Sequence, residues 1–142
     1  TLKEKLNIAV HCIDFMKKLK KTPKIATLSY ARPGDYGRSE EINQSLDDAK
    51  KLTQLIEKHT NQKIENSCVL IDQAIKNKCN ILIAPNGIVG NTIFRTLVLL
   101  NSWPSFGAIT FGIDDIYIDT SRDQSREGYL RSLELAYKLA KL

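Results

Sequence analysis

The stretch that decides the fold is residues 81–91, ILIAPNGIVGN. The run from Asn80 to Ala84 is too apolar to alternate, which is typical of a strand in a parallel sheet covered on both faces. The turn that follows carries Gly87 and Gly90, which let the backbone approach a neighbour or a ligand closely. A helix is then expected from Thr92 to about Asn101. The segment predicts one strand–turn–helix unit of an α/β protein.

Helical and strand patterns alternate along the rest of the chain. Before the central unit we expect a helix with its apolar stripe at positions 2, 6, 9, 13 and 16, a strand over residues 24–30, a helix capped by Ser39 that reaches about His59, and a shorter helix capped by Ser67 that reaches about Lys78. After it we expect strands over residues 107–112 and 116–119, a polar loop over 120–125, and a last helix with its stripe at Leu130, Leu133, Tyr137 and Ala140.

This order of elements predicts a single α/β domain over residues 1–142. The chain is 42% hydrophobic, which is enough for a core and too much for a disordered chain. The strands expected at 107–112 and 116–119 lie too close together for a helical crossover, so we expect an antiparallel pair and a mixed, mostly parallel sheet. Because Thr1 is not an initiator methionine, we expect the chain to be a trimmed product or a fragment.

The net charge of +5 comes from residues 3–24, which hold seven lysines against two acidic residues. A lysine-rich helix end is usually a solvent-exposed face. Nucleic-acid surfaces normally bring arginines into such a patch, and this segment has none, so we expect no nucleic-acid partner.

Other classes of partner and cofactor are also disfavoured. The longest apolar run, residues 92–100, is broken by Arg95 and is too short to span a bilayer, so we expect no membrane partner. No signal peptide opens the chain, which favours a cytoplasmic location. Cys12, Cys68 and Cys79 form no paired motif, and the two histidines lack metal-ligand spacing, so we expect reduced thiols and no metal.

Three polar loops follow predicted strands, at residues 29–38, 86–91 and 119–126. Ligands of open α/β sheets bind at the carboxyl ends of strands. The candidate ligand-binding residues in these loops are Ser29, Arg32, Arg38, Asn86, Gly87, Gly90, Asn91 and Thr120, and the candidate catalytic residues are Ser121 and Arg122.

Two of these loops carry the chemistry of an anion site. Exposed N–H groups at a helix start suit a phosphate, and Asn91 is placed to cap the helix that follows it. The Ser121 hydroxyl and the Arg122 guanidinium suit a phosphate or an acyl phosphate. From the residues alone, both loops also fit ordinary turns, with Arg122 paired to Asp119 or Asp123.

Three segments, taken in order along the chain, resemble the phosphate acetyl/butyryltransferase superfamily. Residues 25–30 are similar to its strand ending in Leu-Ser, residues 81–97 to its strand–turn–Gly-Asn–helix segment, and residues 119–122 to its Asp-x-Ser-Arg motif. Within the superfamily the chain resembles the archaeal methanogenesis marker protein 4 family, also called methyltransferase Mtx subunit X. The resemblance runs from about Leu6 to the end, and it implies that an N-terminal segment of the family is absent from this chain.

The resemblance implies a three-layer α/β/α fold like that of phosphate acetyltransferase and isocitrate dehydrogenase, in a protein that is often a homodimer. In the acyltransferases the thiolate of coenzyme A attacks an acyl phosphate directly. Carried over, Ser121 would help stabilise the tetrahedral transition state and Arg122 would bind the phosphate or coenzyme A side. Gly90 and Asn91 would line the phosphate pocket. Coenzyme A and phosphate are thus the implied substrates, with no other cofactor.

The chain departs from the acyltransferases at two positions. Gly128 stands where they place an aspartate as the proposed base for the thiol, so the neighbouring Glu127 is the third candidate catalytic residue. Asp123 replaces the glycine after the motif arginine, and an acidic group there opposes the binding of a phosphate dianion. The chain also lacks a glycine-rich methyl-donor loop and a corrinoid motif, so its residues do not support methyl transfer.

Two functions therefore fit the sequence. One is a phosphate acyltransferase-like protein that binds a phosphate- or coenzyme A-bearing small molecule and transfers an acyl group. The alternative is a non-catalytic subunit or regulatory partner in methanogenic one-carbon metabolism, bound to a methyltransferase partner protein.

Overall fold

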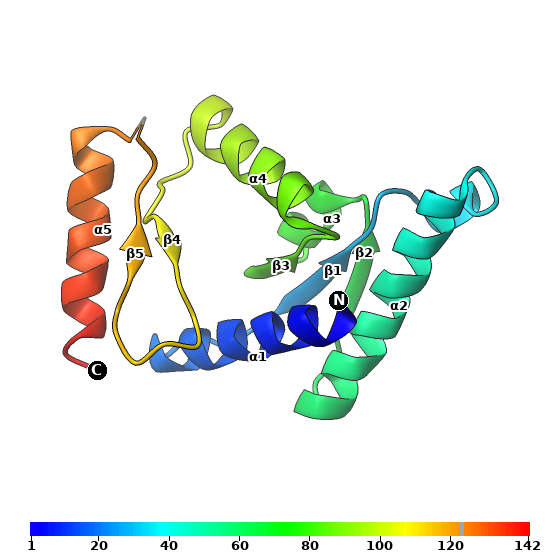
Figure 1. Ribbon diagram of the computed structural model, residues 1–142, viewed down its shortest axis with the longest axis horizontal. Helices are drawn as coiled ribbons and strands as arrows, with labels where there is room; N and C mark the ends of the chain where they lie inside the picture. The colour runs from blue at the N-terminus through cyan, green and yellow to red at the C-terminus, as the bar shows by residue number, and fades with distance from the viewer. Residues whose placement is uncertain (123) are drawn as a thin grey trace. The chain divides into compact units, whose positions relative to one another are not determined.

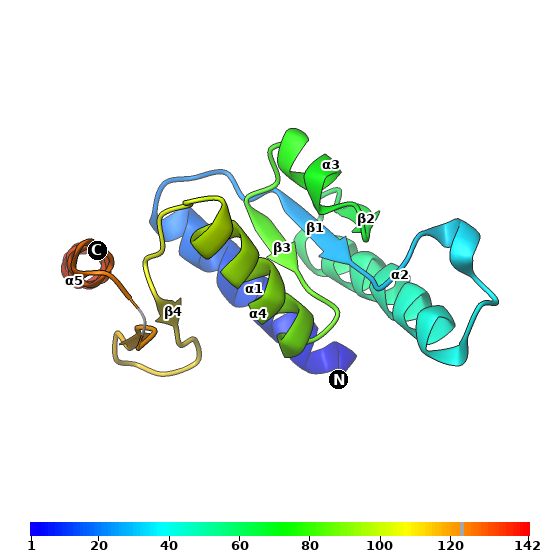
Figure 2. The ribbon, with the colours of Figure 1, turned by 90° about the horizontal axis from the view of Figure 1, so that it is seen from above.

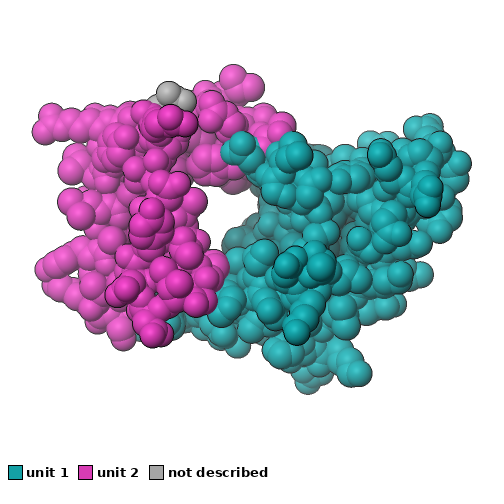
Figure 3. Space-filling model, viewed as in Figure 1, with its two compact units in different colours: residues 1–91 teal, residues 92–142 magenta. Residues whose placement is uncertain are grey.

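The structure is a computed structural model of the 142-residue chain, and it describes residues 1–122 and 124–142. The chain divides into two compact units, residues 1–91 and 92–142 (Figure 3). The boundary falls within helix α4 (Gly87–Arg95), which therefore contributes residues to both units.

Unit 1 is built on a three-stranded parallel sheet with the strand order β2-β1-β3 (Figure 1). The strands are β1 (Ile25–Leu28), β2 (Glu65–Cys68) and β3 (Ile81–Ile83). All four residues of the central strand β1 are buried, as expected for a strand covered on both faces. The parallel α/β character predicted from the central segment is confirmed.

Helices α1 (Leu2–Lys18) and α2 (Glu40–Thr60) pack against each other and against one face of this sheet. Thr1 caps α1 with a capping box, and the Ser39 hydroxyl accepts the N–H of Ile42 at 3.2 Å to cap α2, as predicted. The core between these helices and the sheet consists of Ala9, Ile13, Ile25, Leu52, Ile56, Ile64, Ile81 and Ile83.

Helix α3 (Ile71–Lys76) connects β2 to β3 and buries Ala74. The step from β1 to β2 and the step from β2 to β3 run in opposite directions across the sheet. Right-handed crossovers therefore place α2 and α3 on opposite faces, which is the arrangement visible in Figures 1 and 2. Unit 1 thus has helices on both faces of its sheet, in the α/β/α manner.

The predicted cap at Ser67 is wrong, because Ser67 lies inside β2, a strand that the sequence did not indicate. β2 has the sequence Glu-Asn-Ser-Cys, with neither an apolar run nor β-branched residues, and only its last two residues are buried. Its pairing with β1 is irregular between Thr27 and Leu28, and Cys68 has a φ of +53°. The hydroxyl of Ser67 donates to Glu65 rather than to a helix N–H.

The predicted start of the helix after β3 is also wrong, because α4 begins at Gly87 rather than at Thr92. Asn91 is therefore a residue of the helix and not its cap. The first turn is stabilised from Asn86, whose Oδ1 accepts the N–H of Val89 at 2.9 Å. A π-helical turn, Thr96–Leu100, follows α4.

Unit 2 holds an antiparallel pair, β4 (Ala108–Ile109) with β5 (Ile118–Asp119), and helix α5 (Arg126–Leu139). The antiparallel pairing is as predicted, and the pair forms a two-stranded sheet of its own. Ser125 caps α5 by accepting the N–H of Gly128 at 3.1 Å. The apolar stripe predicted on this helix faces outward in part, since Leu133 and Tyr137 are more than half exposed.

Candidate functional site

The loops that follow β1 and β3 meet at the carboxyl edge of the parallel sheet. The amide Nδ2 of Asn86 donates to the hydroxyl of Tyr30 at 2.6 Å, while Oδ1 of the same side chain caps α4. One asparagine therefore connects the end of β1 to the first turn of the helix after β3. This is the edge at which ligands bind in open α/β sheets.

The two glycines of this segment have different surroundings. A Cβ placed on Gly87 would meet nothing within 4 Å, so the backbone at the start of α4 is open. A Cβ on Gly90 would lie 3.3 Å from the Cβ of Ala84, so the helix starts close against the end of β3. Gly87 thus keeps the helix start accessible, and Gly90 permits close packing.

The side chain of Ser29 stabilises the loop after β1 from inside the protein. Its side chain is buried and donates to the carbonyl of Ala31 at 2.9 Å. Its N–H donates to the carbonyl of Cys68 at 3.0 Å, which extends the pairing of β1 with β2. We therefore place Ser29 among the residues that shape the site.

Arg32 and Arg38 flank a short 3₁₀ turn, Pro33–Asp35, and both are exposed. Asp35 organises this turn, since its carboxylate accepts the N–H of Arg32 at 3.1 Å and pairs with Nη1 of Arg38 at 2.8 Å. The Arg38 side chain is 72% exposed, so this ion pair contributes little to stability. Nearby, the negative charge of Asp47 and a hydrogen bond to it raise the pKa of Tyr36.

The other candidates lie in unit 2, in the loop between β5 and α5. Thr120 is half-buried, whereas Ser121, Arg122 and Glu127 are exposed. The carbonyl of Ser121 accepts from the hydroxyl of Tyr129 at 3.3 Å, which holds the loop against the first turns of α5. Asp123, the second departure from the superfamily, lies outside the described residues.

The space beside Gly128 is filled by Gln124. A Cβ on Gly128 would lie 2.4 Å from the side-chain amide carbon of Gln124. The Nε2 atom of that amide is buried without a hydrogen-bond partner in the described residues. The side chain of Gln124 therefore occupies the position that a longer residue at 128 would need.

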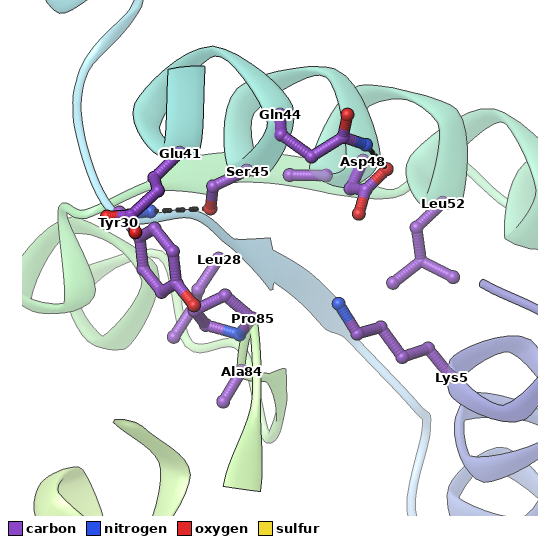
Figure 4. A pocket seen from close by; sticks show the side chains of 11 residues that line it. Lys5, Leu28, Tyr30, Glu41, Gln44, Ser45, Asp48, Leu52, Ala84 and Pro85 are labelled. Carbon is purple, nitrogen blue, oxygen red and sulfur yellow. Dashed lines mark hydrogen bonds between the residues drawn. The ribbon is translucent and has the colours of Figure 1, made fainter. Parts of the chain in front are cut away.

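A cavity of about 420 Å³ opens in unit 1 between α1 and α2 (Figure 4). The sequence analysis did not predict this cavity. Its polar lining residues are Lys5, Tyr30, Glu41, Gln44, Ser45 and Asp48. Gln44 donates to Asp48 at 2.7 Å, and Ser45 accepts the N–H of Tyr30 at 3.0 Å. The sequence feature that could have indicated this lining is its helical spacing, because residues 41, 45 and 48 share a helix face with the core residues Leu52 and Ile56.

Residues 1–122 and 124–142 hold no group of three metal-ligating side chains. In the same part of the chain, no helix has both the length and the apolar character needed to cross a bilayer. All three cysteines are free thiols, and Cys68 is the buried one.

The chain has sequence relatives, although no family model matches it. It is 32% identical over 134 residues to an uncharacterized methyltransferase of Methanocaldococcus jannaschii, covering 94% of this chain and 54% of that protein. It is 34% identical over 123 residues to the "Putative methyltransferase mtx subunit X" of Methanosarcina mazei, covering 86% of this chain and 43% of that protein. The chain is a relative of the Mtx subunit X proteins. It spans about half the length of these relatives.

Two solved structures share the fold of this chain. A phosphotransacetylase from Streptococcus pyogenes superposes with a TM-score of 0.69 and 22% identity, over 100% of this chain and 46% of the enzyme. The EutD phosphotransacetylase from Staphylococcus aureus superposes with a TM-score of 0.66 and 20% identity, over 96% of this chain and 46% of that enzyme. The predicted phosphate acetyltransferase-like α/β fold is confirmed.

Proposed function

We propose that this relative of Mtx subunit X binds a phosphate- or coenzyme A-bearing small molecule and takes part in acyl-group transfer. The observation that carries the proposal is the Asn86 bridge, which holds the open start of α4 at the carboxyl edge of the parallel sheet. A helix start offers N–H donors and the positive end of the helix dipole to an anion. The phosphotransacetylase fold supports the same assignment.

The proposal gives each polar candidate a role. Gly87 leaves the anion-binding start of α4 open, Gly90 lets it pack against the end of β3, and Asn91 lies one turn further along the helix. Arg32 and Arg38 add positive charge in the loop after β1. Ser121 would donate a hydrogen bond to the developing oxyanion, and Arg122 would bind the phosphate or coenzyme A end of the ligand. Thr120 supports that loop. Glu127, exposed in the first turn of α5, is the carboxylate available to accept the thiol proton.

Calorimetric titration tests the binding step. We expect coenzyme A, acetyl phosphate or inorganic phosphate to bind saturably, and Arg122→Ala to weaken that binding at least about tenfold, the effect of losing one charge-assisted contact. The matched control is Arg126→Ala, because Arg126 is an exposed arginine four residues away at the start of α5. Absence of binding by all three compounds would refute the proposal.

The alternative, a non-catalytic subunit bound to a partner protein, has one observation of its own. At position 128 a glycine stands covered by the Gln124 amide, so no carboxylate is available at that position. If the chain binds coenzyme A but does not form acetyl-coenzyme A from acetyl phosphate, and co-purifies with another protein, this alternative is the better account. A cytoplasmic location and a homodimer belong to either version of the proposal.

A further inference from the structure

The cavity between α1 and α2 interrupts an otherwise apolar helix face. The core-facing side of α2 includes Leu52 and Ile56, which pack against the sheet. One to three turns earlier, the same side carries Glu41, Ser45 and Asp48, where continued packing would call for apolar residues. The polar residues begin where β1 ends, so the cavity opens at the carboxyl edge of the sheet.

The cavity is lined by charges of both signs. Lys5 reaches into it from α1, and Glu41 and Asp48 line it from α2 (Figure 4). In the part of the chain that the structure describes, none of these three side chains takes part in an ion pair. Lys5 and Asp48 are half-buried. A ligand that forms ion pairs with these groups would therefore make charge-assisted contacts that the protein itself leaves unmade.

A buried hydroxyl also faces this space. Ser45 is only 7% exposed, and its Oγ accepts the N–H of Tyr30. No oxygen or nitrogen of the described residues accepts the proton of that hydroxyl, so one donor remains unused. Asp48 uses one carboxylate oxygen for Gln44 and keeps the other. The lining thus offers one cation, two carboxylates and one hydroxyl donor.

We propose that this cavity binds a small zwitterion. The acidic group of the ligand, a carboxylate or a phosphate, pairs with the ammonium of Lys5, and its own ammonium lies against Asp48 and Glu41. A volume of about 420 Å³ is within the range of small-molecule sites. The cavity adjoins the proposed anion site, because Tyr30 lines it and also accepts the hydrogen bond from Asn86. Its charged groups, Lys5, Glu41 and Asp48, have no part in the proposed acyl-transfer function, so the two proposals can fail independently.

The test is calorimetry on the 142-residue chain with matched probes. The zwitterions are 4-aminobutanoate and 2-aminoethyl phosphate, and the analogues without the ammonium are butanoate and ethyl phosphate. We expect at least one zwitterion to bind about tenfold more tightly than its analogue, as one added charge-assisted contact implies. The zwitterion that binds more tightly identifies whether the site takes a carboxylate or a phosphate.

Variants assign the two charges. Asp48→Asn should weaken the zwitterion about tenfold and leave its single-charge analogue unchanged, whereas Lys5→Met should weaken both. Lys5→Arg should restore binding and shows that the loss is not due to misfolding. Lys3→Met and Glu40→Gln, which alter exposed neighbours outside the cavity lining, should change nothing. Binding by none of the probes, or zwitterion binding that is indifferent to Asp48→Asn, would overturn the proposal.

Discussion

The side-chain amide nitrogen of Asn86 lies 2.6 Å from the hydroxyl oxygen of Tyr30, and this contact joins the ends of two neighbouring strands. The same asparagine caps α4, so two structural tasks depend on one side chain. Asn86→Ala removes both interactions, and we expect it to lower the free energy of unfolding by about 1–2 kcal/mol. Urea unfolding followed by circular dichroism measures the change.

The control for that prediction is Asn86→Asp. An aspartate keeps the cap acceptor and can accept a hydrogen bond from the Tyr30 hydroxyl, so stability should stay within about 0.5 kcal/mol. Tyr30→Phe isolates the second contact and should cost no more than about 1 kcal/mol. If Asn86→Ala, Asn86→Asp and Tyr30→Phe all lower the free energy of unfolding by the same amount, Asn86 does not serve as the cap.

Gly107 leaves no room for a side chain. Its φ is +86°, and an added Cβ would lie 2.6 Å from Cγ2 of Ile118 and 2.8 Å from the backbone oxygen of Asp119. Gly107→Ala should therefore destabilise the β4–β5 pair and lower the free energy of unfolding by about 2–4 kcal/mol. Gly34→Ala is the matched control, because a Cβ added at Gly34 would meet nothing within 4 Å. A thermal unfolding midpoint that is the same for both variants would contradict this account.

Gln124 and Gly128 should behave as a coupled pair. Gly128→Ala alone gains about 1 kcal/mol of helix propensity but must displace the Gln124 side chain, so we expect a net change near zero. In a Gln124→Ala background the obstruction is gone, and the same change should stabilise the protein by about 1 kcal/mol. A double-mutant cycle in urea measures this difference. Additive effects would mean that Gln124 does not fill the space beside Gly128.

Glu65 should make the folding stability of the protein sensitive to acid. A hydrogen bond from Ser67, aided by others from Asn77 and Cys79, lowers the pKa of Glu65 below its ordinary value of 4.5. A carboxyl group with a depressed folded-state pKa stabilises the protein above its unfolded-state pKa, and this contribution is lost as the pH falls through the folded-state value. Glu65→Gln should therefore flatten the loss of stability below about pH 4.5.

Urea midpoints between about pH 3 and pH 7 test this prediction. Asp14→Asn, on the exposed face of α1, serves as the control and should leave the acid dependence unchanged. The Cys79 thiol, whose pKa burial and the charge of Glu65 both raise, should stay unreactive toward alkylating reagents near neutral pH. An acid limb that is equally steep with and without Glu65 would count against the hydrogen-bonded carboxylate.

The sequence predicted those elements whose local and tertiary signals agree. The apolar runs around Ile25 and Ile81 became strands β1 and β3, and Ser39 capped its helix as expected. Strand β2 was missed because its polar residues owe their extended form to pairing with β1, which a local pattern does not contain. The start of α4 was misplaced because Gly87 and Gly90 resemble turn residues, whereas here they permit an open and closely packed helix start.

The candidate site was predicted unevenly for a related reason. Asn86 was singled out from its position after a strand, and the structure shows it bridging two loops. Ser29 is buried and donates to Ala31, and its role as a ligand contact stays a prediction. The cavity lining was missed because Glu41 and Asp48 have the composition of a solvent-exposed face, and only their register with Leu52 brings them to the cavity.

On the side of α2 that lines the cavity, the residues that would bind a ligand stand where apolar residues would stabilise the fold more. Extending the apolar stripe from Leu52 through Asp48 and Ser45 would fill the cavity and should strengthen the fold. The same substitutions would remove the groups that could hold a ligand. Selection for thermal stability alone should therefore favour such changes, and it would remove the cavity in doing so.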